Sequence, residues 1–256
     1  MNRPSPLGTL GLLGAFVLPL LGQGCMTEKR MERALAHVDL GTAYYREGSY
    51  EAAIEELTLA AKTDHRNWRA LNALAVAYVA KGETELAEET FAKALRMNPD
   101  EAEILLNHGA LQLNQGQRKE AIASFQHALQ DIDYRNQSYV LSNLAFALIE
   151  DGQPDAAVAA AREAVRRTPD LCEGWFHLGL AQEARKDPEA ALNAYQEVQR
   201  RCPSESLGAR LRAGCLQLQG LDPVYGQATL QQVVAEAPDT PFADRARSCL
   251  MHGGQP

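Results

Sequence analysis

The sequence predicts an all-α fold, in which an array of six helix–turn–helix repeats ends in a capping helix. Gly48, Gly82, Gly116 and Gly152 follow one another at intervals of 34, 34 and 36 residues, and a fixed period of this length is typical of repeat proteins. Apolar residues on both sides of each glycine recur with the spacing of one helix face. No long Gly/Ser-rich or Pro-rich linker interrupts residues 34–251, so we expect one continuous array.

The first residues are typical of an exported protein. Residues 1–24 contain a single charged residue, and Leu7–Leu21 is an uncharged apolar run that is too short for a spanning helix of roughly 20 residues. Cys25 after a small residue resembles the end of a bacterial lipoprotein signal, which implies lipidation of Cys25, and Met26 after it favours the outer membrane. We expect residues 1–24 to be a lipoprotein signal peptide and residues 25–33 a short tether. The alternatives are an ordinary secretory signal and an uncleaved anchor.

The second repeat shows the periodic pattern most clearly, in the stretch WRALNALAVAYVAKGETELAEETFAKALRMNPD, residues 68–100. Each half places apolar residues on one helix face, and Pro99 closes the unit. This pattern resembles the tetratricopeptide repeat (TPR), in which a helix A and a helix B form a hairpin and the hairpins stack into a right-handed superhelix. In that family small residues at positions 8 and 20, here Ala75 and Ala87, let the two helices approach closely. The other apolar residues of the two faces are Leu71, Leu74, Tyr78, Phe91 and Ala94.

The same pattern recurs six times, and the resemblance covers residues 34–240. The segment PFADRARSCLMH, residues 241–252, predicts a capping helix with Arg and Asp on its outer face, because an array of stacked repeats needs a polar end. The predicted repeats are residues 34–67, 68–101, 102–135, 138–171, 172–205 and 207–240, with two residues inserted before the fourth.

Four cysteines follow Cys25, and in an exported chain they are expected to form disulfides. Four cysteines can pair in three ways. In the TPR fold the start of helix A lies beside the end of helix B, which implies a bond between Cys172 and Cys202. The capping helix is expected to stack on the sixth repeat, which implies a bond between Cys215 and Cys249. The alternative is four buried free thiols.

The sequence contains no constellation of catalytic residues. The six histidines are scattered, and no HExxH, Cys/His zinc spacing, GxSxG, P-loop or GxGxxG motif is present. The carboxylate pairs Glu55–Glu56 and Glu88–Glu89 lie in charged runs that a solvated helix face explains. Removing residues 1–24 takes away one basic residue and lowers the net charge from −8 to −9, which argues against a nucleic-acid binder. We therefore expect no enzyme activity, cofactor, metal, small-molecule substrate or nucleic-acid partner.

The candidate site is the inner face of the array, which positions 2, 5, 9 and 12 of helix A line in the TPR fold. The Lys and Asn of the TPR carboxylate clamp are replaced by Val38 and Thr42, and asparagines at position 6 are limited to Asn107 and Asn143. An apolar groove suits an amphipathic or extended segment of another protein. The alternative is that these residues pack against a neighbouring helix A or under the N-terminal segment. The predicted groove residues are Val38, Tyr45, Val76, Val79, Leu106, Leu113, Phe146, Ile149, Phe176 and Leu180.

A lipidated cysteine followed directly by six TPRs, with disulfides late in the array, resembles the pilotins of type IV pilus assembly. The openings ALAHVDLGTAYYREGSYEAAIEEL and NALAVAYVAKGETELAEETFAKAL are similar to the first two repeats of that family, and the size and capped sixth repeat are similar to its member from gliding bacteria. The resemblance implies a lipid-anchored protein on the periplasmic face of the outer membrane. It would bind the protein protomers of the secretin, the pore through which the pilus passes, and promote their multimerisation, pilus biogenesis and motility. The alternative is a TPR lipoprotein scaffold in cell-wall synthesis or outer-membrane β-barrel assembly.

Overall fold

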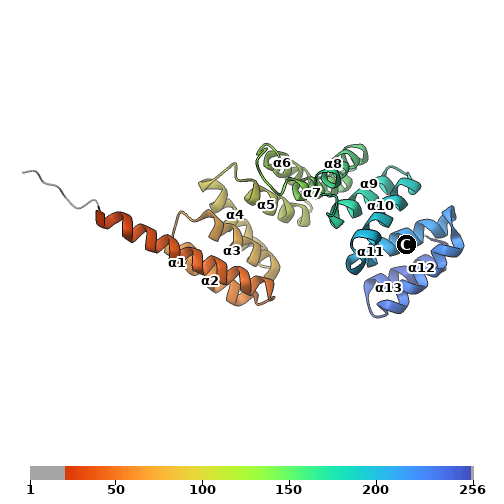
Figure 1. Ribbon diagram of the computed structural model, residues 1–256, viewed down its shortest axis with the longest axis horizontal. Helices are drawn as coiled ribbons and strands as arrows, with labels where there is room; N and C mark the ends of the chain where they lie inside the picture. Colours follow the sequence, from red (N-terminus) through yellow and green to blue (C-terminus); the bar gives the residue numbers. More distant parts are fainter. Residues whose placement is uncertain (1–20, 255–256) are drawn as a thin grey trace, which may run out of the picture.

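The computed structural model describes the backbone of residues 21–254 and the side chains of residues 28–254. Residues 1–20 of the expected signal peptide lie outside the described residues, and so does the side chain of Cys25. Within the described part the chain forms six helical hairpins and a final helix, with no β-strand, so the all-α prediction is confirmed. Figure 1 shows the hairpins following one another along an arch, from α1 at one end to α13 at the other.

Each predicted repeat corresponds to one hairpin of a helix A and a helix B. The helices A are α1 (Leu21–Arg46), α3 (Trp68–Lys81), α5 (Ala102–Asn114), α7 (Gln137–Glu150), α9 (Cys172–Ala184) and α11 (Leu207–Leu216). The helices B are α2 (Tyr50–Thr63), α4 (Thr84–Met97), α6 (Arg118–Ala128), α8 (Pro154–Arg167), α10 (Pro188–Arg201) and α12 (Pro223–Glu236). The short turns η1 (Pro203–Glu205) and η2 (Gln217–Leu221) flank α11, and α13 (Pro241–Met251) is the final helix.

The first helix is longer than the other helices because it extends beyond its own hairpin. Residues 25–33, expected to be a tether, are turns of α1, and residues 28–33 are exposed. Figure 1 shows this part of α1 projecting away from the body of the molecule. Residues 28–33 therefore do not cover the groove. Leu40, which the repeat pattern places in the core, is 42% exposed, because no preceding helix B packs against the first repeat.

Four of the six hairpins close where a glycine of helix A meets a large side chain of helix B. A Cβ atom on Gly109 would lie 2.7 Å from Cε1 of Phe125, and a Cβ atom on Gly41 would lie 2.6 Å from Cγ of Leu57. Because real Cβ atoms do not come so close, a larger residue at either glycine would push the two helices apart. The same close approach joins Gly179 to Tyr195 and Gly214 to Leu230.

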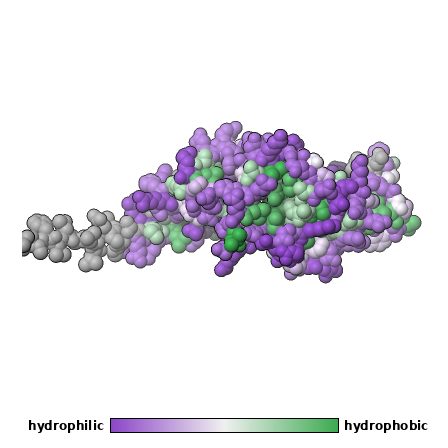
Figure 2. Space-filling view, turned by 90° about the horizontal axis from the view of Figure 1, so that it is seen from above, coloured by the Kyte–Doolittle hydropathy of each residue, from purple (hydrophilic) through white to green (hydrophobic). Residues whose placement is uncertain are grey.

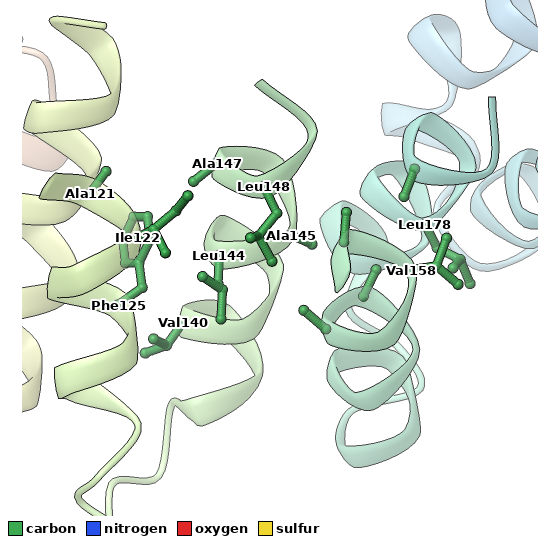
Figure 3. Close-up of a cluster of buried hydrophobic side chains, with 14 of the residues drawn as sticks. Ala121, Ile122, Phe125, Val140, Leu144, Ala145, Ala147, Leu148, Val158 and Leu178 are labelled. Carbon is green, nitrogen blue, oxygen red and sulfur yellow. The ribbon is translucent and has the colours of Figure 1, made fainter. Parts of the chain in front are cut away.

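The hydrophobic core runs along the array instead of forming one centre. Its largest cluster extends from α5 to α10, and Figure 3 shows side chains of α6, α7, α8 and α9 meeting in it. Ile122 and Phe125 of α6 lie against Val140 and Leu144 of α7, and all four are buried. Each hairpin thus packs mainly on its neighbours, which is how stacked repeats obtain a continuous core.

The turn between helix A and helix B needs a left-handed backbone at position 15 of the repeat. Glycine provides it in the first four repeats, and Gly152, for example, has a φ of 73°. In the fifth repeat the same position holds Lys186, with a φ of 62°. A side chain in this conformation costs roughly 1–2 kcal/mol, so the fifth turn is strained where the others are not.

Two disulfides lie in the last part of the array. Cys172 at the start of α9 is joined to Cys202 just beyond α10, with Cα atoms 6.2 Å apart. Cys215 of α11 is joined to Cys249 of α13, with Cα atoms 5.7 Å apart. Both separations suit a disulfide. The first bond clips the fifth hairpin, and the second fastens the final helix to the sixth repeat.

His177 of α9 is buried at the contact between the fourth and fifth repeats. Its ring stacks on Phe146 of α7, with ring centroids 5.1 Å apart, and its Nδ1 atom lies 2.9 Å from the carbonyl oxygen of Ser142. Burial lowers the pKa of His177 from 6.5 to about 4, because the surrounding apolar side chains disfavour the charged ring.

Reducing the disulfides is expected to destabilise the last two repeats. The bonds close loops of 30 and 34 residues, so replacing either pair by serines should lower the free energy of unfolding by roughly 3 kcal/mol, measured by urea denaturation. A peptide map of the unreduced protein should recover the two pairs, and a peptide that joins Cys172 to Cys215 would contradict the assignment.

The Lys186→Gly variant should be more stable than the wild type. Glycine adopts the left-handed conformation without a steric penalty, so the free energy of unfolding should rise by about 1 kcal/mol in urea denaturation. The reciprocal control, Gly152→Lys in the equivalent turn of the fourth repeat, should lower the free energy of unfolding by about the same amount. An unchanged or lower stability of Lys186→Gly would show that the fifth turn is not strained.

The stability of the protein should depend on the ionisation of His177. Below pH 6.5 the unfolded chain binds a proton that the folded chain takes up only near pH 4, so the free energy of unfolding should fall as the pH falls through this window. The expected loss is roughly 1.5 kcal/mol between pH 6.5 and pH 5. The His177→Phe variant should lose this slope, whereas the control His65→Phe, at an exposed position, should keep it.

Candidate protein-binding groove

The ten predicted groove residues lie on five successive helices A. The helices α1, α3, α5, α7 and α9 each contribute two of them, and all ten side chains are partly exposed. Neighbouring helices A contact one another along the array, so the pairs of residues follow one another from helix to helix.

The groove residues also take part in the core. Val76 and Val79 pack against the cluster around Phe91, and Phe176 and Leu180 pack against the cluster around Tyr195. Each of these residues therefore packs between helices on one side, as the alternative expects, and remains accessible on the other side. A surface that is held by the core in this way is rigid and partly apolar, which suits a docking site for another protein.

The first half of the groove contains a hollow of about 290 Å³ between α1, α3 and α5. One wall is formed by α1, with Val38, Thr42 and Tyr45, and Val76 of α3 continues the apolar lining. The opposite wall is polar. The remaining lining residues are Arg69, Asn72, Ala73, Glu103 and Asn107.

Hydrogen bonds fix the polar wall of this hollow. The side-chain nitrogen of Asn72, which is only 3% exposed, donates to Oε1 of Glu103 at 3.0 Å. The amide oxygen of Asn72 accepts from Asn107 at 3.1 Å. Two helices A are thus joined side by side, and the hollow offers an apolar and a polar wall to a bound segment. Such a pairing suits an amphipathic strand or helix, which carries apolar and polar side chains on opposite faces.

Sequence reasoning did not single out Arg69 and Glu103 at position 2 or Asn72 at position 5, because the predicted groove residues were the apolar ones at the inner-face positions. Asn107 occupies position 6, where asparagines of successive repeats would form a row along the groove, but its side chain binds Asn72. Asn143 instead donates to the backbone oxygen of Tyr139. The inner-face positions of Asn72 and Glu103 were the signal that could have predicted their contact.

The described residues contain neither a cluster of metal ligands nor a membrane-spanning helix. Among them, no group of three or more His, Cys, Asp or Glu side chains could hold a metal ion. None of the helices that the structure describes is both long and apolar enough to cross a membrane. Figure 2 shows polar side chains over most of one face of the molecule and apolar surface gathered over the middle of the array.

Comparison with known proteins relates both the sequence and the fold to pilus assembly proteins. The type IV pilus assembly protein PilF of Pseudomonas aeruginosa is 30% identical over 152 residues, which are 56% of this chain and 60% of that protein. The matched segment thus spans less than two thirds of the length of this relative.

Solved structures share the fold. The P. aeruginosa PilF structure superposes with a TM-score of 0.73 at 23% identity, and it covers 86% of this chain and 99% of its own. PilW, described as a widely conserved type IV pilus biogenesis factor, superposes with a TM-score of 0.76 at 22% identity, over 82% of this chain and 96% of its own. At this level of identity the likeness shows the fold alone.

A family model described as tetratricopeptide repeat matches residues 38–102, 72–136 and 143–206. Together these matches cover more than half of the chain, and they fall on the hairpins that the structure shows. The chain therefore belongs to the tetratricopeptide repeat family.

Proposed function

We propose that this protein is a pilotin, a lipid-anchored assembly factor of the outer membrane that promotes multimerisation of the type IV pilus secretin. The observation that carries the proposal is the 30% identity to the pilus assembly protein PilF over 152 residues. The fold similarity to the PilF and PilW structures is consistent with it.

The groove supplies the binding chemistry. A secretin protomer with apolar segments exposed before assembly would gain by covering them, and the hollow near α1 offers an apolar wall opposite the polar wall of Asn72 and Glu103. Covering an apolar segment removes its surface from water, which favours binding by about 25 cal/mol per Å² of buried apolar area. The contact would be stoichiometric and non-catalytic, and it would prevent premature association of protomers.

The lipid anchor would place this groove where the client is needed. Lipid chains on Cys25 would hold the protein on the periplasmic face of the outer membrane. Residues 28–33 of α1 project from the body, so they would act as a helical spacer between the anchor and the groove. Confinement of the protein and the secretin to one surface raises their effective concentration.

Deleting the gene should abolish the heat-stable secretin multimer while the monomer persists, as measured by immunoblot of unheated cell envelopes. The Cys25→Ala variant should incorporate no fatty-acid label and should lower the multimer signal, because the groove is no longer held at the membrane. Normal multimers in the deletion strain would refute the proposal. A general loss of outer-membrane barrel proteins would favour a scaffold in barrel assembly instead.

A matched pair of variants tests whether the groove carries this activity. Val76→Arg places a charge in the hollow, and it should lower the multimer signal severalfold at unchanged protein level. The control Leu86→Arg makes the same change on α4, where the side chain is 43% exposed and lies outside the groove, and it should leave the multimer intact. Equal effects of both variants would remove the groove from the proposal.

A further inference from the structure

The last part of the groove contains a second pocket, which is about 270 Å³ in volume and lies between α9, α11 and α13. Position 2 of three successive units lines it: Glu173 in α9, Gly208 in α11 and Phe242 in α13. Position 2 belongs to the inner face of each unit. The final helix, expected only to cap the array with polar residues, thus also contributes an aromatic side chain to the groove.

Two aromatic rings lie beside Gly208. A Cβ atom on this glycine would lie 3.5 Å from Cε1 of Phe242 and 3.6 Å from Cε2 of Phe176. Gly208 has no side chain, so the surface beside the two rings is open. Phe242 is 41% exposed and Phe176 is partly exposed, so both rings are accessible to a ligand.

The charged residues that line this pocket are both acidic. Glu173 and Glu205 are the ionisable residues among its lining, together with Cys172, Phe176, Val198, Gly208, Ala209 and Phe242. Neither carboxylate forms an ion pair in the described part of the chain. Desolvation by the surrounding protein raises the pKa of Glu173, so its negative charge is poorly compensated there.

The arginines near this end of the groove have other partners. Arg201 binds Asp170 and Glu197, and Arg210 binds Glu236. An incoming cation would therefore meet two carboxylates that no basic residue of the pocket neutralises.

We propose that this pocket receives the lysine or arginine side chain of a protein segment bound in the groove. The aliphatic stem would lie on Gly208 between the rings of Phe176 and Phe242, and the charged head would bind Glu173 and Glu205. A cation near an aromatic face is attracted to it, and a long basic side chain buries its stem while its head stays near water. The inference rests on the proposed function, in which the groove holds a client. It adds that the client carries a basic residue at the end that reaches the final helix.

Small probes test the pocket without the client. The isotope-labelled full chain, with its disulfides intact, is titrated with n-butylguanidinium and n-butylammonium, and the neutral n-butylurea serves as a matched probe. Both cations should shift the amide resonance of Gly208 and the ring resonances of Phe176 and Phe242. The neutral probe should not shift them. The double variant Glu173→Gln, Glu205→Gln should weaken the binding of the cations roughly fivefold.

The control variant Glu189→Gln, Asp239→Asn removes the same net charge at exposed positions outside the pocket and should bind the cations like the wild type. The inference is overturned if n-butylurea shifts the same resonances equally, if both double variants weaken binding equally, or if the shifted resonances lie elsewhere. Secretin multimers in the deletion strain report on the proposed function separately. If the deletion abolishes the multimers but the protein binds neither cation, only the pocket proposal is refuted. If the protein binds the cations but multimers form normally in the deletion strain, only the pilotin function is refuted.

Discussion

The close approach of helix A to helix B is the contact on which the rest of this structure depends. It is possible because a glycine at position 8 of four repeats accepts a large side chain of the partner helix, as Gly109 accepts Phe125. A Cβ atom there would force the hairpin open. Once the hairpins are closed, their outer residues pack against the next hairpin, and the core grows along the array from cluster to cluster.

Stacking of equal hairpins also produces the groove. Because every helix A has nearly the same orientation relative to its neighbours, the same repeat positions come to lie side by side on one face. Apolar residues at these positions are held from one side by the core and remain accessible from the other. The groove is therefore preformed, which lowers the conformational cost of binding a partner. Its two ends differ, since a polar wall at Asn72 and Glu103 marks one end and two phenylalanines with two carboxylates mark the other.

The two ends of the array face a physical problem that the inner repeats do not share, because each lacks one neighbour. At the first repeat the missing neighbour leaves Leu40 exposed, and α1 continues outward as a projecting helix. At the last repeats two disulfides fasten α9 to α10 and α11 to α13. They compensate for a sixth repeat whose turn is irregular and contains the π-helical segment η2. Stability that packing supplies in the middle is thus supplied by covalent bonds at this end.

Periodicity in the sequence was enough to predict the all-α fold and the hairpins, and the resemblance to the tetratricopeptide repeat named ten groove residues, whose role in binding stays a prediction. Such patterns involve residues close together in the sequence, and the same packed positions recur in every repeat. The sequence could not show that residues 25–33 continue α1, that Lys186 takes a left-handed turn position, or that Asn72 binds Glu103 and Asn107. It also could not show that Phe242 of the final helix and Phe176 both lie beside Gly208. The contacts of Asn72 and Gly208 join residues about 30 to 35 positions apart, and only the stacking angle between hairpins, a property of the whole array, brings them together.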